Sequence, residues 1–213
     1  MIPEFLQGIS ERINPSHTAL LIIDMQRDLV YDNYLCHKAN RDLSATRNII
    51  PNIKILVSRA RTVGVAVCHV GFWTLPDNGS DSVAWLQQRR CSTYSSEDLC
   101  LAGTPGAEFI DELKPEKNEV VIHKHRYSAF KGTNLDMILR ARCIKTVITA
   151  GVSTNVCVES TLRDAFETGY HVVIPSDATA SWNMSLHEST LETVKHRFGY
   201  VTCTSEILNH WKD

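Results

Sequence analysis

Short apolar runs rich in β-branched residues alternate with longer segments of helical spacing along most of the chain. A short continuous apolar run is typical of a buried strand, whereas apolar positions at i, i+3 and i+4 indicate a helix. Strands are predicted at residues 19–24, 65–70, 119–122, 146–150, 171–175 and 200–203. Between them, helices are predicted at residues 49–60, 133–142, 154–168 and 188–198.

This alternation predicts a three-layer α/β/α sandwich with a six-stranded parallel sheet, a Rossmann-like α/β fold, because right-handed crossovers place helices on both faces of a parallel sheet. No repeat, low-complexity tract or linker divides the sequence, so a single domain over residues 1–213 is expected. Ligands of such sheets bind beyond the carboxyl ends of the strands, where strand order reverses. The site should therefore lie just after Ile23 and just after Ala150.

The charge and composition of the chain limit the kinds of binding partner that it can have. The chain has 213 residues with 22 basic against 24 acidic side chains, a formal charge of −2. No electrostatic excess would draw it to nucleic acid or to an anionic membrane. Its apolar runs are shorter than a spanning helix needs, and its first residues lack a basic, then apolar, signal segment. We expect a cytoplasmic protein with a small-molecule partner.

The cysteine and glycine patterns exclude several site classes. No C-x-x-C pair, H-E-x-x-H motif, dinucleotide-binding glycine motif, Walker A loop or G-x-S-x-G elbow occurs. A disulfide framework, a zinc site and a serine α/β-hydrolase are therefore disfavoured, and neither a metal nor a cofactor is expected. Most of the thiols should be small buried hydrophobes. The seven cysteines are Cys36, Cys68, Cys91, Cys100, Cys143, Cys157 and Cys203.

Three residues follow predicted strands at the expected site. Asp24 ends the first strand, Lys124 follows the third, and Cys157 falls in the first helical turn after the fourth. Taken singly, each residue has an ordinary interpretation: Asp24 as a helix cap or loop carboxylate, Lys124 as a solvated edge lysine, and Cys157 as a packing cysteine. Free N–H groups at a helix N-terminus favour a thiolate, which makes Cys157 a candidate nucleophile. Alternation along the strand would turn His123 and His125 away from Lys124.

Together these groups match nucleophilic catalysis. A carboxylate can take the thiol proton and pass it to a leaving amine, while an ammonium group keeps the carboxylate ionised. The segments TALLIIDMQ, KHRYSAF, GVSTNVCVESTLRDA and SDATAS resemble those of the isochorismatase-like cysteine hydrolases. The resemblance implies the isochorismatase-like hydrolase fold, an Asp24–Lys124–Cys157 triad, a cis peptide between Val152 and Ser153, and an oxyanion hole formed by the backbone amides of Ser153 and Cys157.

The sequences of these segments are most similar to those of ureidoacrylate amidohydrolases and of hydrolases of biuret, triuret and N-carbamoyl compounds. The resemblance implies a metal-independent amidohydrolase that cleaves a C–N bond through a thioester-type intermediate, releases ammonia or an amine, and forms a dimer or tetramer. Trp73 and Tyr127 would line the substrate pocket, or serve as ordinary core or rim aromatics. Phe130 and Asn155 are expected to be structural.

Three alternatives stay open. An isochorismatase-type ether hydrolase is disfavoured because such members typically lack the cysteine. A nicotinamidase-like amidase is disfavoured because the stretch HVGFWT lacks the metal-binding D-x-H segment. The third is a non-catalytic thiol sensor or binding protein. Specificity should lie in residues 71–105 and in the C-terminal part, where the candidate carboxylate or carbonyl partners, or plain surface residues, are Arg89, Arg90, His187 and Arg197.

Overall fold

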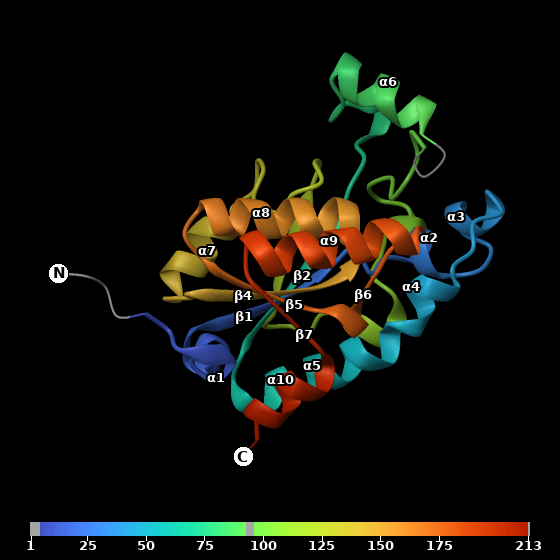
Figure 1. Ribbon diagram of the computed structural model, residues 1–213. Helices are drawn as coiled ribbons and strands as arrows, with labels where there is room; N and C mark the ends of the chain where they lie inside the picture. The colour runs from blue at the N-terminus through green and yellow to red at the C-terminus, as the bar shows by residue number, and fades with distance from the viewer. Residues whose placement is uncertain (1–4, 93–95, 213) are drawn as a thin grey trace.

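A parallel β-sheet runs through the centre of the computed structural model, which describes residues 5–92 and 96–212 (Figure 1). Its strand order is β3-β2-β1-β4-β5-β7, and a short strand β6 pairs with β4. All six expected strands are present, and β6 is additional because two residues are too few to produce a pattern. The strands are β1 (Thr18–Ile23), β2 (Ala66–Phe72), β3 (Val120–Lys124), β4 (Thr146–Val152), β5 (His171–Pro175), β6 (Thr179–Ala180) and β7 (Tyr200–Thr202).

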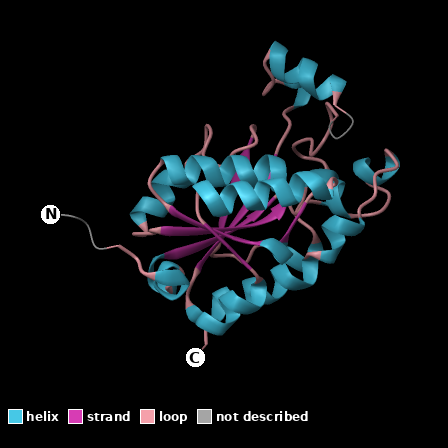
Figure 2. Cartoon of the chain, in the orientation of Figure 1, coloured by secondary structure: helices cyan, strands magenta, loops and turns pink. Residues whose placement is uncertain are grey.

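Helices cover both faces of the sheet, so the expected three-layer α/β/α fold is confirmed (Figure 2). α7, α8 and α9 lie on one face, and α5 and α10 lie on the other. α6 stands apart from both layers. The helices are α1 (Gly8–Arg12), α2 (Arg27–Val30), α3 (Leu35–Lys38), α4 (Ser44–Asn48), α5 (Ile50–Val63), α6 (Val83–Cys91), α7 (Leu135–Ala141), α8 (Glu159–Glu167), α9 (Met184–Arg197) and α10 (Thr204–His210).

The core consists of two apolar clusters, one on each face of the sheet. Successive residues of β1 alternate between them: Leu20 and Ile22 belong to one cluster, and Leu21 and Ile23 to the other. Complete burial of such an aliphatic side chain contributes about 1.5–3 kcal/mol. Because both faces are covered, β1 is apolar without interruption, and this is the pattern that identified it in the sequence.

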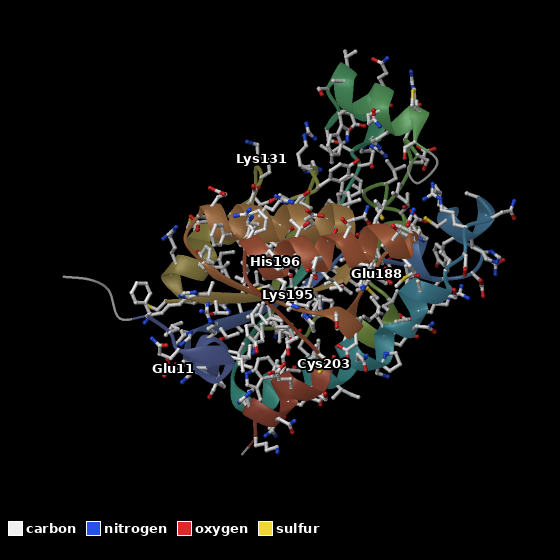
Figure 3. All side chains as sticks on the ribbon, in the orientation of Figure 1. Glu11, Lys131, Glu188, Lys195, His196 and Cys203 are labelled. Atoms are coloured by element: carbon white, nitrogen blue, oxygen red, sulfur yellow. The ribbon has the colours of Figure 1, made fainter. Side chains whose placement is uncertain are left out.

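Unlike β1, which is apolar on both sides, helix α9 is apolar on one side only. α9 buries Thr190 and Val194 against the sheet, while Glu188, Lys195 and His196 are exposed (Figure 3). Such an amphipathic helix covers a sheet and faces solvent on its other side. No helix within residues 5–92 and 96–212 is both long and apolar enough to cross a membrane.

The carboxyl ends of β1 and β4 lie side by side, with Ile23 opposite Gly151. From this point the chain crosses to β2 on one side and to β5 on the other, so strand order reverses here as expected. Gly151 has φ 112°, and a Cβ atom there would lie 2.1 Å from the carbonyl oxygen of Ile23. Only glycine allows this close approach of the two strands.

The cysteines occupy different environments. All seven are free thiols, and Cys36, Cys68 and Cys100 are buried as expected. Cys91 and Cys143 are exposed, so the expectation of burial is wrong for these two. They lie at the end of α6 and just after α7, where the chain leaves the apolar face of a helix.

Candidate active site

Three side chains from separate strand ends meet at the reversal point. Nζ of Lys124, the last residue of β3, lies 2.9 Å from Oδ2 of Asp24 and 3.2 Å from Sγ of Cys157. Lys124 is fully buried, and its ammonium group also lies over the Phe72 ring, 5.0 Å from the ring centre. Oδ1 of Asp24 has no hydrogen-bond partner among the described residues. The sequence-predicted candidates are therefore in direct contact, and one carboxylate oxygen is left free to accept a proton.

The backbone around Asp24 fixes its direction. Asp24 follows β1 directly and adopts the left-handed conformation with φ 54°, which is uncommon for a residue other than glycine and is found at functional sites. Its N–H donates to the carbonyl oxygen of Val70 at 2.8 Å. The buried side chain of Gln26 then joins two segments, because its amide nitrogen donates to the carbonyl oxygens of Phe72 at 2.9 Å and Ala107 at 2.8 Å.

Cys157 lies in a π-helical turn, Thr154–Val158, that leads into α8. A π-helical turn is rare and often found at functional sites. The Thr161 hydroxyl donates to the carbonyl oxygen of Cys157 at 2.7 Å, and Oγ1 of Thr154 lies 2.8 Å from Nδ1 of the buried His187. The peptide bond between Val152 and Ser153 is cis, where the resemblance placed it. Contacts from α8 and α9 thus hold the turn that carries the thiol.

Burial and charge set the protonation states of this group. Burial raises the pKa of Asp24, and the Lys124 ammonium group opposes that rise. Burial would lower the pKa of Lys124, but the charges of Asp24 and Cys157 outweigh it and hold that pKa above its ordinary value. Burial also raises the pKa of the Cys157 thiol, as does the Asp24 carboxylate. The N-terminal position of Cys157 does not overcome this desolvation, so the thiol needs a base, and Asp24 is the carboxylate expected to take its proton.

A cavity of about 180 Å³ opens onto Cys157 and Asp24. Its walls are mainly apolar and come from six separate parts of the chain. The polar lining groups other than Asp24 and Cys157 include Ser153, Asn155, Ser181, Asn183 and Arg89. The apolar lining includes Leu29, Phe72, Trp85, Leu99, Trp182 and Leu186.

Of the two aromatic residues predicted to contact the substrate, one lines the cavity and the other does not. Tyr127 lines the cavity, with its ring 4.6 Å from that of Trp85. Trp73 lies outside the cavity, stacked on His123 at 3.6 Å between ring centres. The reason is strand alternation: Phe72 faces the cavity, so the next residue faces the opposite side of the sheet. The same alternation turns His123 away from Lys124, as expected.

The remaining specificity candidates have distinct surroundings. Arg89 lines the cavity but is buried, and its guanidinium group lies 2.8 Å from Oδ2 of Asp81 and 3.0 Å from Oγ1 of Thr74. Arg90 is an exposed partner of Glu97. Arg197 is exposed at the end of α9. Residues 93–95 of the predicted specificity segment lie outside the described residues.

The two residues expected to be structural also differ. Phe130 packs in the core next to Tyr170, with 5.8 Å between ring centres. Asn155 lines the cavity, and its Oδ1 accepts hydrogen bonds from Ser153 Oγ at 2.9 Å and Ser181 Oγ at 2.6 Å. Asn155 therefore braces the turn and also contributes to the cavity wall.

Most of the apolar wall comes from the two regions where specificity was expected, residues 71–105 and the C-terminal part, but its individual residues were not predicted. Phe72, Trp85 and Trp182 belong to β2, α6 and the segment after β6. None of the three stands in a chemical motif, although Trp182 directly follows SDATAS, the last segment of the resemblance. The described residues contain no group of three or more His, Cys, Asp or Glu side chains that could hold a metal ion.

A parallel α/β sheet with a cysteine, a carboxylate and a lysine gathered beyond its strand ends defines the class of cysteine hydrolases. The family model of the isochorismatase domain matches residues 18–206. The chain therefore belongs to the isochorismatase family.

Individual relatives agree with this assignment. Ureidoacrylate amidohydrolase RutB of Agrobacterium fabrum is 33% identical over 205 residues, which cover 92% of this chain and 90% of the relative. A cysteine hydrolase from Pseudomonas syringae pv. phaseolicola superposes with a TM-score of 0.84 at 27% identity, covering 99% of this chain and 98% of the other. N-carbamoylsarcosine amidase from Thermoplasma acidophilum has a TM-score of 0.71 at 26% identity, with 88% and 96% covered.

Proposed function

We propose that this chain is a metal-independent cysteine amidohydrolase that cleaves a C–N bond of a small amide or ureido compound. One observation carries the proposal: the Lys124 ammonium group lies within hydrogen-bond distance of both Asp24 and Cys157, which places a base, a cation and a nucleophile in one buried cluster. The names of the relatives support the bond type, since a ureidoacrylate amidohydrolase and an N-carbamoylsarcosine amidase both act on C–N bonds.

The first half of the reaction acylates the thiol. Asp24 takes the proton of Cys157 as the sulfur attacks the substrate carbonyl carbon, because the thiol is not ionised at rest. The backbone N–H groups of Ser153 and Cys157 are proposed to hold the developing oxyanion, a contribution of about 3–4 kcal/mol per donor in comparable sites. Asp24 then protonates the leaving nitrogen, the C–N bond breaks, and a thioester remains, or a thiocarbamate from a ureido substrate.

The second half releases the acid. Asp24, again a carboxylate, takes a proton from water as the water oxygen attacks the acyl carbon. The C–S bond breaks and the proton returns to sulfur, which restores the thiol and the carboxylate. A carbamic acid product would then lose carbon dioxide without further help from the protein.

Lys124 has a supporting part in both halves. Its charge keeps Asp24 ionised against the desolvation that favours the neutral acid, and its contact with Sγ stabilises negative charge on sulfur during transfer. In our proposal the ammonium group holds its own proton throughout, since its pKa lies above the ordinary value.

Further expectations accompany this proposal. Ureidoacrylate, biuret, triuret and N-carbamoyl compounds are the candidate substrates from the resemblance. We also propose a single domain, a cytoplasmic location, and a homo-oligomer of two or four chains. Size-exclusion chromatography with light scattering tests the last point, and a monomer at micromolar concentration would contradict it.

Ammonia release across a substrate panel tests the function. The panel comprises ureidoacrylate, biuret, triuret, N-carbamoyl amino acids, nicotinamide and maleamate, assayed with the wild-type chain and with Cys157→Ala. We expect turnover of at least one compound by the wild type only. A carbon product from isochorismate without ammonia would indicate an ether hydrolase instead, and alkylation of Cys157 without turnover of any amide would indicate a thiol-binding protein.

A further inference from the structure

The cavity is apolar, compact and without a spare positive charge. From this combination we infer that the substrate is an uncharged amide or ureide whose non-reacting end is a flat, apolar group. The inference rests on the proposed amidohydrolase function and goes beyond it by excluding anionic compounds such as ureidoacrylate as the preferred substrates.

The size and lining of the cavity match one flat ring. Its volume is about 180 Å³, and an engineered apolar cavity of about 150 Å³ in another protein binds benzene. Leu29, Phe72, Leu99 and Trp182 contribute to the walls. An apolar group transferred from water to such walls gains the hydrophobic contribution of its whole surface.

The aromatic wall is fixed by its own neighbours. The Trp85 ring is 4.6 Å from Tyr127, and the Arg126 guanidinium group lies over it at 4.9 Å from the ring centre. Arg126 is not a lining residue, and its Nη1 donates to the carbonyl oxygen of Ser80 at 2.8 Å. A ring held in place in this way offers a flat surface for stacking without a large loss of side-chain entropy.

Both cationic side chains at the cavity already have a carboxylate partner. Lys124 pairs with Asp24 at 2.9 Å, and Arg89 pairs with Asp81 at 2.8 Å in an ion pair that is almost fully buried. Residues 93–95, which follow Ser92 in the sequence and are outside the described residues, are Thr-Tyr-Ser and include no cationic side chain. A substrate carboxylate would therefore lose its hydration without gaining a cationic partner, which opposes binding.

The polar lining groups suit the reacting end instead. Ser153, Asn155 and Ser181 lie together beside Cys157, joined through Oδ1 of Asn155. These groups are uncharged donors and acceptors, which match a neutral amide or ureide better than an ion. The reacting group of such a substrate can therefore meet uncharged polar partners in a cavity whose walls are mainly apolar.

Matched neutral and anionic substrates test the inference. One pair is benzamide and 4-carbamoylbenzoate, and the other is methyl 3-ureidoacrylate and 3-ureidoacrylate; kcat/KM for ammonia release is compared within each pair. We expect the neutral member to be favoured by at least about tenfold, the cost of burying one poorly compensated charge. Equal or higher kcat/KM for the anions would overturn the inference while leaving the amidohydrolase function intact.

Binding separates this inference from the proposed function. Calorimetry on Cys157→Ala measures affinity for benzamide and 4-carbamoylbenzoate without turnover. Tighter binding of benzamide supports the inference even where no compound is hydrolysed, a result that would sink the proposed function alone. Binding of neither compound, or tighter binding of the anion, overturns the inference.

A charge-introducing variant gives the reciprocal test. Leu186 lines the cavity and is 46% exposed, so Leu186→Lys can place an ammonium group at its rim. We expect kcat/KM for the anion to rise at least about fivefold relative to its neutral partner. Met137→Lys is the matched control, since Met137 is 65% exposed on α7 and does not line the cavity. An unchanged ratio in Leu186→Lys, or an equal change in both variants, contradicts the inference.

Discussion

Nζ of Lys124 lies 2.9 Å from Oδ2 of Asp24, and the two side chains are 0% and 3% exposed. The pair joins residues 100 positions apart in the sequence and forms only when β3 and β1 bring their carboxyl ends to the same edge of the sheet. A buried ion pair of this kind is costly to form and more costly to break, because removing one partner leaves the other charge unmatched.

Removal of the lysine should therefore affect both stability and activity. Lys124→Met leaves the Asp24 carboxylate buried without its cation, and we expect a loss of about 3–5 kcal/mol in the free energy of unfolding. The pKa of Asp24 should rise further, so turnover should fall by at least about a hundredfold. Urea unfolding and ammonia release measure the two effects. Lys131→Met, at an exposed lysine (Figure 3), is the control and should change neither by much.

A double variant separates charge from packing. Asp24→Asn combined with Lys124→Met removes both charges, so its free energy of unfolding should recover toward the wild-type value while activity stays lost. Stability as low as that of Lys124→Met alone would show that the lysine acts through packing and not through its charge.

The pH dependence follows from the shifted pKa values. Burial raises the pKa of Asp24 above its ordinary 3.8, and the proposed base acts only when ionised. Activity should therefore rise with pH through that raised pKa, with the acid midpoint of kcat/KM above 3.8. The pKa of Cys157 is raised above its ordinary 9.0 and that of Lys124 above 10.5, so no further limb is expected up to about pH 9. A rise in activity centred near pH 8 to 9 would indicate a free, ionising thiol instead.

The contact between Gly151 and Ile23 can be tested by adding one methyl group. In Gly151→Ala the new Cβ would lie 2.1 Å from a backbone oxygen, so the end of β4 must shift and we expect a loss of more than about 4 kcal/mol of stability. Gly132→Ala is the matched control, because Gly132 also has a positive φ, 71°, but nothing lies within 4 Å of its Cβ position. It should lose only about 1–2 kcal/mol. Equal losses in thermal unfolding would show that the close approach is not the cause.

Chelators should leave the activity unchanged. No cluster of three metal-ligating side chains exists in residues 5–92 and 96–212, and the proposed steps use only the thiol, the carboxylate and the lysine. Ammonia release is measured after dialysis against EDTA, with and without added zinc. Loss of turnover that zinc restores would overturn the metal-independent assignment.

Much of the fold could be predicted because both faces of the sheet are covered. Buried strands are apolar without interruption, and a long helix such as α5 repeats its apolar face every three to four residues, so both leave a local signal. Short helices such as α2 and α3, of four residues each, are too brief to repeat a pattern. They form because neighbouring segments hold them: Oδ1 of Asp28, for example, accepts from the backbone N–H of Leu35.

The candidate site also contains residues that could be predicted from the sequence and residues that could not. Asp24, Lys124 and Cys157 could be predicted because each follows a recognisable strand and carries reactive chemistry. Trp73 could not be placed, since its side depends on the register at which β2 ends. Arg89 looked equally like a surface residue, and only its contact with Asp81 shows that it is buried and neutralised.

The sequence by itself determined the order of strands and helices and the chemical groups at the strand ends, because these depend on local spacing. The tertiary structure alone decided that burial raises the pKa of the Cys157 thiol, that Phe72 and not Trp73 faces the cavity, and that Lys124 and Arg89 each have a carboxylate partner. Each of these depends on burial or on contacts between distant segments, and desolvation and pairing are properties of the folded chain.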